Sequence, residues 1–96
     1  MSANLHRKLA AWAANHSSVQ ALHVFGSRAR GDASFDSDLD IAFDLESRHG
    51  NDLSELIVNA PQWKAELTKL TGVLVKDLYL RRDLQPDETI VTVFRR

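Results

Sequence analysis

The sequence contains no cysteine, which excludes disulfide bonds and metal sites built from thiolates. It also lacks an apolar run long enough to cross a bilayer, and its first residues lack the apolar core of a signal peptide. The formal net charge is only -1, so no strong field attracts nucleic acids non-specifically. These absences lead us to expect a cytoplasmic protein with no membrane segment and no direct binding to nucleic acid.

The length of the chain leaves room for one domain, which we assign to residues 1–96. Hydrophobic residues make up 44% and charged residues 26%, the usual proportions of a globular domain. We find no internal repeat, low-complexity tract or linker. The function must therefore be inferred from short motifs within one small domain.

One stretch, Gly26 to Asp44, joins a glycine-serine turn to closely spaced carboxylates and reads GSRARGDASFDSDLDIAFD. Apolar residues precede it, as in a buried strand over 19–25 that leads into a tight turn. After the turn, apolar and polar residues alternate over 38–45. This period of two predicts a half-buried strand with carboxylates on its polar face.

Asp38 and Asp40 lie two positions apart, so in a strand they point the same way with Cα atoms about 6.5 Å apart. Each carboxylate raises the pKa of the other unless a cation neutralises both, and hard oxygen ligands suit Mg²⁺. The turn at Gly26 and Ser27 lets backbone N–H groups approach an anion. The two motifs, ten residues apart, predict a phosphate-binding turn beside a metal-binding pair of carboxylates.

GSRARG followed by DSDLDI resembles the nucleotidyltransferase superfamily that includes DNA polymerase β, and within it the minimal nucleotidyltransferase (MNT) domains. The family pattern is Gly-Ser, a spacer of about this length, D-x-D, and a third carboxylate on a later strand. Asp77, in VLVKDLYL, falls at that third position, although alone it would be interpreted as an acid at a strand edge. Lys76 stands where the family usually has an apolar residue.

The resemblance implies nucleotidyl transfer from a nucleoside triphosphate, with ATP as the expected substrate. By the same resemblance, Asp38 and Asp40 would bridge two Mg²⁺ ions. Asp77 would complete the ion nearer the acceptor and help to deprotonate the acceptor hydroxyl. Two metal ions can clamp the attacking and leaving oxygens of such a displacement.

The resemblance also assigns the triphosphate to the turn. Gly26 and Ser27 would hold the β- and γ-phosphates, and a basic residue would assist them. Arg28 and Arg30 are both candidates, and we prefer Arg30. Both arginines remain open to the simpler interpretation of solvent-exposed charge.

Short MNT proteins resemble the antitoxins of HEPN–MNT toxin–antitoxin pairs. The implied partner is a HEPN-type ribonuclease toxin in a hetero-oligomer, and the implied reaction is transfer of AMP to a toxin tyrosine. Two alternatives stay open, namely an antitoxin that only binds its toxin and an antibiotic nucleotidyltransferase. The second is less favoured, because such enzymes generally carry a further domain that shapes the small-molecule site.

Apolar periodicity predicts the remaining elements. We expect helices over 3–16, 27–31, 52–59 and 61–70, a turn at 47–51 and a strand over 73–80. Pro61 separates the helices expected over 52–59 and 61–70. Asp52 and Glu55 resemble a capping box at the start of the first of these two helices. Residues 89–94 favour a strand by their β-branched side chains, but flanking acids and arginines lead us to predict a helix. The fold class is α/β or α+β, a small mixed sheet with helices on one face and an open acidic face, as in nucleotidyltransferases.

Overall fold

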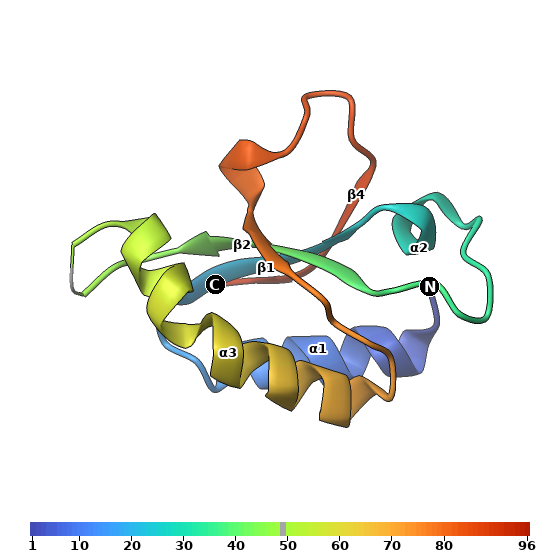
Figure 1. The fold of residues 1–96 in the computed structure, drawn as a ribbon, viewed down its shortest axis with the longest axis horizontal. Coiled ribbons are helices and arrows are strands. Elements are labelled where there is room, and N and C mark those ends of the chain that lie inside the picture. Colours follow the sequence, from blue (N-terminus) through green and yellow to red (C-terminus); the bar gives the residue numbers. More distant parts are fainter. Residues whose placement is uncertain (49) are drawn as a thin grey trace.

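Four strands form one mixed sheet in the order β3-β2-β1-β4 in the computed structural model, which describes residues 1–48 and 50–96. They are β1 (Val19–Phe25), β2 (Asp40–Leu45), β3 (Leu78–Leu80) and β4 (Ile90–Arg95). β1 pairs antiparallel with β2 and β4, whereas β2 and β3 run parallel. Helices α1 (Ala3–Ala14) and α3 (Asp52–Thr71) lie on the same side of the sheet (Figure 1). The predicted fold class is confirmed.

The hydrophobic core lies between these two helices and the sheet. Trp12 of α1, Phe43 of β2 and Trp63 of α3 meet there, with ring centroids 5.3–6.0 Å apart. The indole N–H of Trp12 donates to Glu66 Oε1 at 2.9 Å, so its polar group is satisfied. The central inward-facing positions of β1 and β2 are fully buried, namely Leu22, Val24, Ile41 and Phe43. Burial of these strands fixes the register that positions the turn after β1.

Ser2 begins α1, because its side chain accepts a hydrogen bond from the backbone N–H of Leu5 at 3.1 Å. The helix ends at Ala14, two residues before the predicted end. Its apolar stripe buries Leu9, Trp12 and Ala13 against the sheet. The predicted first helix, strand and short helix are thus all present, the last as α2 (Ser27–Arg30).

The predicted division of residues 52–70 at Pro61 is wrong, since α3 continues through that proline. A proline inside a helix removes one hydrogen bond and costs about 3 kcal/mol. Leu56 before Pro61 and Trp63 and Leu67 after it are all buried on one face of α3. Their joint burial outweighs the proline, at roughly 1.5–3 kcal/mol for each large apolar side chain.

The predicted capping box at the start of α3 is also displaced. Asn51 is the N-cap, and its side chain accepts from the backbone N–H of Ser54 at 2.8 Å. Glu55 instead turns inward and is buried. The turn predicted at 47–51 includes His49, which lies outside the described residues.

Two predicted strands are shorter than expected, because side chains bind the backbone groups that a ladder would use. The carbonyl oxygens of Ser37 and Asp38 accept from Arg28, so β2 begins at Asp40 and not at residue 38. Before β3, the backbone N–H groups of Val73 and Val75 donate to threonine hydroxyl groups. β3 therefore spans 78–80 in place of the predicted 73–80.

The helix predicted over residues 89–94 is wrong, since Ile90–Arg95 form β4. The β-branched side chains of this segment fit a half-buried strand. Arg96 does not interact with the dipole of a helix of its own segment. Its guanidinium donates to the carbonyl oxygens of Ala13 in the last turn of α1, of His16 just after that helix, and of Val19 at the start of β1.

Candidate active site

The end of β1 and the start of β2 bring the two sequence motifs into contact. Phe25, the last residue of β1, pairs in register with Asp40, the first residue of β2. Gly26 follows with φ 73° and ψ -154°, a conformation that side chains disfavour. A Cβ atom on Gly26 would overlap with Oδ2 of Asp40. Glycine is thus required both by the backbone and by the carboxylate that packs against it.

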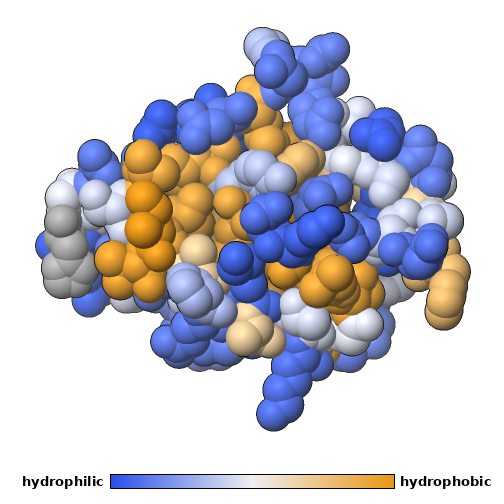
Figure 2. All heavy atoms as spheres, in the orientation of Figure 1, coloured by the Kyte–Doolittle hydropathy of each residue, from blue (hydrophilic) through white to orange (hydrophobic). Residues whose placement is uncertain are grey.

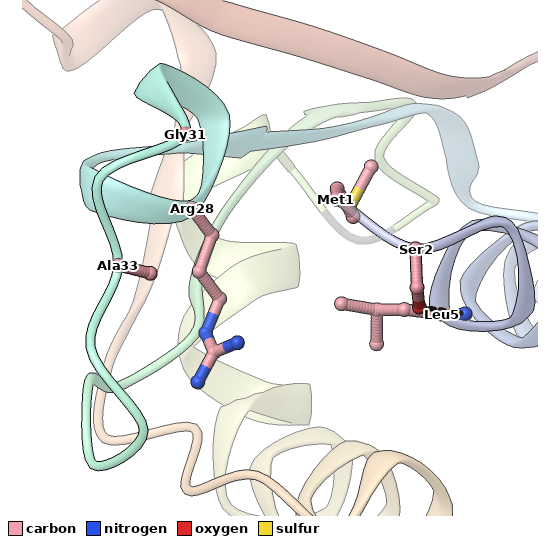
Figure 3. A pocket seen from close by; sticks show the side chains of 6 residues that line it. All are labelled: Met1, Ser2, Leu5, Arg28, Gly31 and Ala33. Atoms are coloured by element: carbon pink, nitrogen blue, oxygen red, sulfur yellow. Dashed lines mark hydrogen bonds between the residues drawn. The ribbon is translucent and has the colours of Figure 1, made fainter.

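Arg28 fixes the loop that leads into β2. Its Nη2 donates to the carbonyl oxygen of Ser37 at 2.6 Å, and its Nε to that of Asp38 at 3.4 Å. The side chain points into a cavity of about 270 Å³ between α2 and the start of α1, where Met1, Ser2 and Leu5 form the other wall (Figure 3). Arg28 therefore places the backbone of Asp38 and is occupied by that contact.

Arg30, the preferred phosphate contact, is half exposed and lies closest to Asp32, with Nε 3.3 Å from Oδ2. An exposed ion pair of this kind is worth little, so the Arg30 side chain can change partners at small cost. Gly31 ends α2 with φ 83°. The assignment of Arg30 to a phosphate remains a prediction, and the structure leaves its guanidinium at the surface.

Asp40 lies among other acids. Burial raises the pKa of its carboxyl above the usual value, and the charges of Asp38 and Glu88 raise it further. The charges of Arg30 and Arg28 act in the opposite direction. Glu88 comes from the connection between η1 (Arg81–Asp83) and β4, and sequence reasoning did not single it out. A nearby cation would stabilise the charged form of a carboxyl group that is partly buried beside other acids.

Asp77 directly precedes β3, which is the strand that pairs with β2. Ile41 pairs with Leu78 in parallel register. The residues one step earlier, Asp40 and Asp77, therefore lie at the same end of these two neighbouring strands. After burial, the charges of Asp77 and Asp40 are the causes that raise the pKa of Tyr79. The structure thus brings the third predicted carboxylate to the region of the first two.

Comparison with known proteins identifies the family of the chain. The family described as "Polymerase beta, Nucleotidyltransferase" matches residues 7–84. The chain belongs to this nucleotidyltransferase family. The match runs from α1 through η1 and includes the turn at Gly26 and all three predicted carboxylates. No curated protein and no solved structure is significantly similar to the chain. None of the helices described could span a membrane.

Nucleotidyltransferases of this family typically use Mg²⁺ and a nucleoside triphosphate. The chemistry of Asp38 and Asp40 fits such an ion, since Mg²⁺ often binds through one or two carboxylates and keeps several waters. Within residues 1–48 and 50–96, no three His, Asp or Glu side chains are grouped closely enough to hold a metal ion. The pair therefore fits Mg²⁺, whereas the role of Asp77 as a third ligand remains a prediction.

An aromatic pair lies beside the nucleotidyltransferase site, since Phe25 precedes Gly26 and pairs in register with Asp40. The rings of Phe25 and Tyr79 meet edge to face with centroids 5.2 Å apart. Phe25 is on β1 and Tyr79 on β3, with β2 between them, and neighbouring strands lie about 4.8 Å apart. The two rings must therefore lean toward each other over β2, where Ala42 is small enough to leave room. Motif spacing gave no signal for this contact.

A second polar cluster lies further along the same face. His23 is fully buried, and its Nε2 lies 3.0 Å from Asp44 Oδ2. Its Nδ1 lies 2.8 Å from Thr92 Oγ1, and Arg81 Nε donates to Asp44 Oδ1 at 3.3 Å. The segment that begins with η1 lies over this side of the sheet, opposite the two long helices (Figure 1). The acidic face expected to be open is thus partly covered.

Proposed function

We propose that this nucleotidyltransferase transfers AMP from ATP to a tyrosine of a HEPN-type ribonuclease toxin and so acts as the antitoxin of the pair. The observation that carries the proposal is the contact between Gly26 and the carboxylate of Asp40. It holds the phosphate-binding motif against the metal-binding motif. Positioning and charge neutralisation are most of what such a transfer asks of a protein.

The residues of the site would divide the work as follows. Backbone N–H groups of Gly26 and Ser27 bind the β- and γ-phosphates, and Asp38 and Asp40 hold Mg²⁺. When bound there, Mg²⁺ would neutralise the carboxylates and triphosphate and stabilise the charge on the departing pyrophosphate. The tyrosine oxygen bonds to the α-phosphorus as the bond to the bridging oxygen breaks. Asp77 accepts the phenolic proton.

An exposed apolar surface supports a protein as the acceptor. Leu53, Ile57 and Val58 of α3 are 45%, 63% and 73% exposed. Figure 2 shows apolar side chains gathered over this half of α3. Contiguous apolar surface on a small domain often marks a site for another protein. A docked partner would supply its own hydroxyl group to a domain that has little surface for an acceptor pocket.

The test is intact mass spectrometry of the cognate toxin after incubation with this protein, ATP and Mg²⁺. We expect one or more added AMP groups on tyrosine, absent with Asp38→Ala or Asp40→Ala. Asp36→Ala is the matched control, because Asp36 is an exposed acid of the same loop that binds only Ser34 among described contacts. No transfer by the wild-type protein, or undiminished transfer by both site variants, would refute the proposal.

Two other results would redirect the proposal. Neutralisation of the toxin by the Asp38→Ala, Asp40→Ala double variant with no mass change would identify an antitoxin that acts by binding. That alternative draws support from the absence of a three-ligand metal group among the described side chains. Transfer to an aminoglycoside and to no protein would move the chain to the antibiotic-modifying class.

A further inference from the structure

A groove lined with lysines lies between the second half of α3 and the segment that leads into β3. Its volume is about 460 Å³, and none of the described side chains that line it is acidic. This lysine groove is formed mainly by Lys64, Thr68, Lys69, Leu74, Val75 and Lys76. It has no part in the chemistry of the transfer proposed above.

Hydrogen bonds fix the backbone of the segment that forms one wall of the lysine groove. The N–H of Val75 donates to Thr68 Oγ1 of α3 at 3.0 Å, and the carbonyl oxygen of Leu74 accepts from the N–H of Leu39 at 2.9 Å. Val75 is buried, whereas Leu74 is 54% exposed and Lys76 is exposed. An apolar side chain is therefore held at the surface beside the lysines.

The three lysines of the groove have no counter-ions within the fold. Among residues 1–48 and 50–96, none of them forms a hydrogen bond or an ion pair through its side chain. Lys69 lies in the last turn of α3, where the helix end carries about half a negative charge. That partial charge is much smaller than three whole positive charges, so the groove favours an anionic partner.

The lysine groove joins two surfaces that the proposed function already uses. Ile57 and Lys64 are seven residues apart, so they lie on the same side of α3, about 10 Å apart along its axis. Ile57 belongs to the exposed apolar surface at the start of that helix. At the other end of the groove, Lys76 directly precedes Asp77, the third predicted carboxylate. A partner that covers the apolar surface can therefore extend along the groove to the transfer site.

We propose that the lysine groove binds a segment of the acceptor protein in which acidic side chains surround an apolar one, an inference that rests on the proposed transfer to a protein. Carboxylates of the segment pair with Lys64, Lys69 and Lys76, and its apolar side chain packs on Leu74. The segment is then held beside Asp77, so that neighbouring residues of the same protein, the acceptor tyrosine among them, reach the site.

Positive charge alone would also suit a nucleic acid or an anionic membrane, but other features favour a protein segment. No aromatic side chain on which a base could stack lines the groove in the described part of the chain. The net charge of -1 provides no field that attracts a long polyanion. Anionic lipid surfaces are usually bound by clusters of about four to eight basic residues, which is more than the three lysines here.

The probe is the dye-labelled peptide DELDELDE, titrated with the full chain in the absence of ATP and Mg²⁺. We expect saturable binding by fluorescence anisotropy, with changes in the backbone amide signals of Thr68 and Val75. The double variant Lys64→Gln, Lys76→Gln should bind about tenfold more weakly, because two ion pairs are lost. Leu74→Ala should bind about fivefold more weakly, because the apolar contact is lost.

Matched controls separate this site from general charge attraction. The double variant Arg7→Gln, Arg95→Gln removes as many exposed positive charges outside the groove, and it should bind the peptide as the wild type does. The peptide DESDESDE keeps the charge but lacks leucine, so the wild type should bind it about fivefold more weakly. The charge-reversed peptide KRLKRLKR should not bind.

Several results would overturn the inference. They are equal affinity of the wild type and the Lys64→Gln, Lys76→Gln variant, equal affinity for the two acidic peptides, and no saturation at about 1 mM peptide. Displacement of the labelled peptide by a short oligouridine, or by vesicles that contain phosphatidylglycerol, at lower concentrations than by unlabelled peptide would assign the groove to nucleic acid or membrane instead.

Transfer kinetics distinguish this inference from the proposed function. The Lys64→Gln, Lys76→Gln variant should raise the KM for the toxin about tenfold and leave kcat and the KM for ATP unchanged. Asp38→Ala should abolish transfer but bind the peptide as the wild type does. Lysine-dependent peptide binding with no transfer by the wild type would refute the proposed function and keep the groove as a site for acidic protein segments. Transfer with an unchanged KM for the toxin in the lysine variant would overturn the docking inference alone.

Discussion

Asp40 and Asp44 lie four residues apart on the same face of β2, yet their surroundings differ. Asp44 is bound on one side by the buried His23 and on the other by Arg81. Asp40 packs against Gly26, and its nearest charged influences include two further acids. The strand thus carries one acid that is neutralised within the fold and one that is not. An acid kept near other acids indicates a ligand site, whereas an acid with donors indicates a structural role.

The hydrogen-bond chemistry of His23 sharpens this contrast. The carboxylate of Asp44 can only accept, so the Nε2 atom of His23 carries a proton. In a neutral ring Nδ1 then accepts from the hydroxyl of Thr92. A chain of contacts therefore runs from β4 across β1 and β2 to η1, and every polar atom of His23 is used. Among residues 1–48 and 50–96, no such chain is formed at Asp40.

The largest effect is expected at the contact that defines the site. Gly26→Ala places a Cβ atom onto Oδ2 of Asp40 and forces alanine into φ 73° with ψ -154°, a region nearly reserved for glycine that by itself costs about 1–3 kcal/mol. We expect transfer to fall on the order of 100-fold, because the carboxylate is displaced. Gly31→Ala is the control, since its φ is 83° but its Cβ would meet nothing within 4 Å. Equal loss of transfer in both variants would show that backbone strain alone matters. Transfer assays measure the loss of activity, and denaturant unfolding measures the cost of the backbone strain.

The next prediction compares a substitution of Asp44 with a substitution of Asp40. Asp44→Ala leaves a buried N–H of His23 without an acceptor, so the free energy of unfolding should fall by about 1–3 kcal/mol. Asp40→Asn removes repulsion and should leave stability unchanged or higher, but abolish Mg²⁺-dependent ATP binding. Urea unfolding and calorimetric titration of ATP with and without Mg²⁺ provide the measurements. A stability loss in Asp40→Asn as large as that in Asp44→Ala would remove the distinction between the two acids.

The pH dependence of stability should separate the two kinds of acid by sign. The pKa of Asp40 is raised in the folded state, so the free energy of unfolding falls as pH rises from the ordinary value to the raised value. Asp40→Asn should remove that fall. The pKa of Asp52 is lowered, chiefly by its hydrogen bond from Arg82, and its stabilisation is lost as pH falls through the lowered value. Urea midpoints across acidic pH should change in opposite directions in Asp40→Asn and Asp52→Asn, and a change of the same sign would contradict this.

The smallest effect concerns the aromatic pair between the two acids. Tyr79→Ala removes the edge-to-face contact with Phe25 and should cost about 0.5–1.5 kcal/mol beyond the lost burial. Tyr79→Phe keeps the ring, so its unfolding should match the wild type. Thermal unfolding of the three proteins measures this. Equal stability in all three would mean that the rings do not support each other over β2.

The sequence was sufficient to predict the elements that follow from local patterning. The first strand and the short helix after it were identified because apolar alternation and glycine act over a few residues. The turn at Gly26 and the acid at 40 were expected to meet at neighbouring strand ends, and they do. This part of the site follows from spacing that two paired strands impose.

The remaining differences come from contacts between distant residues. β2 and β3 are short because Arg28 and two threonines bind nearby backbone groups, and no local pattern predicts those bonds. α3 passes through Pro61 because burial on both sides outweighs a local breaker. β4 exists because β1 offers an unpaired edge, whereas its flanking charges taken alone suggested a helix. The charge of Glu88 acts on Asp40 only because the fold brings the two residues near each other, so no motif signalled it.

The strand order has a consequence for hydrogen exchange within the site. β1 and β2 are interior strands, with neighbours on both sides, whereas β3 is an edge strand of three residues. Amide hydrogens of β1 and β2 should exchange slowly, and those of residues 78–80 should exchange through local opening at much lower cost. Gly26 and Asp40 are attached to the protected strands, but Asp77 is attached to the one that opens. The two motif elements therefore form a fixed frame, and the exchange rates of residues 78–80 should slow when a ligand engages the third acid.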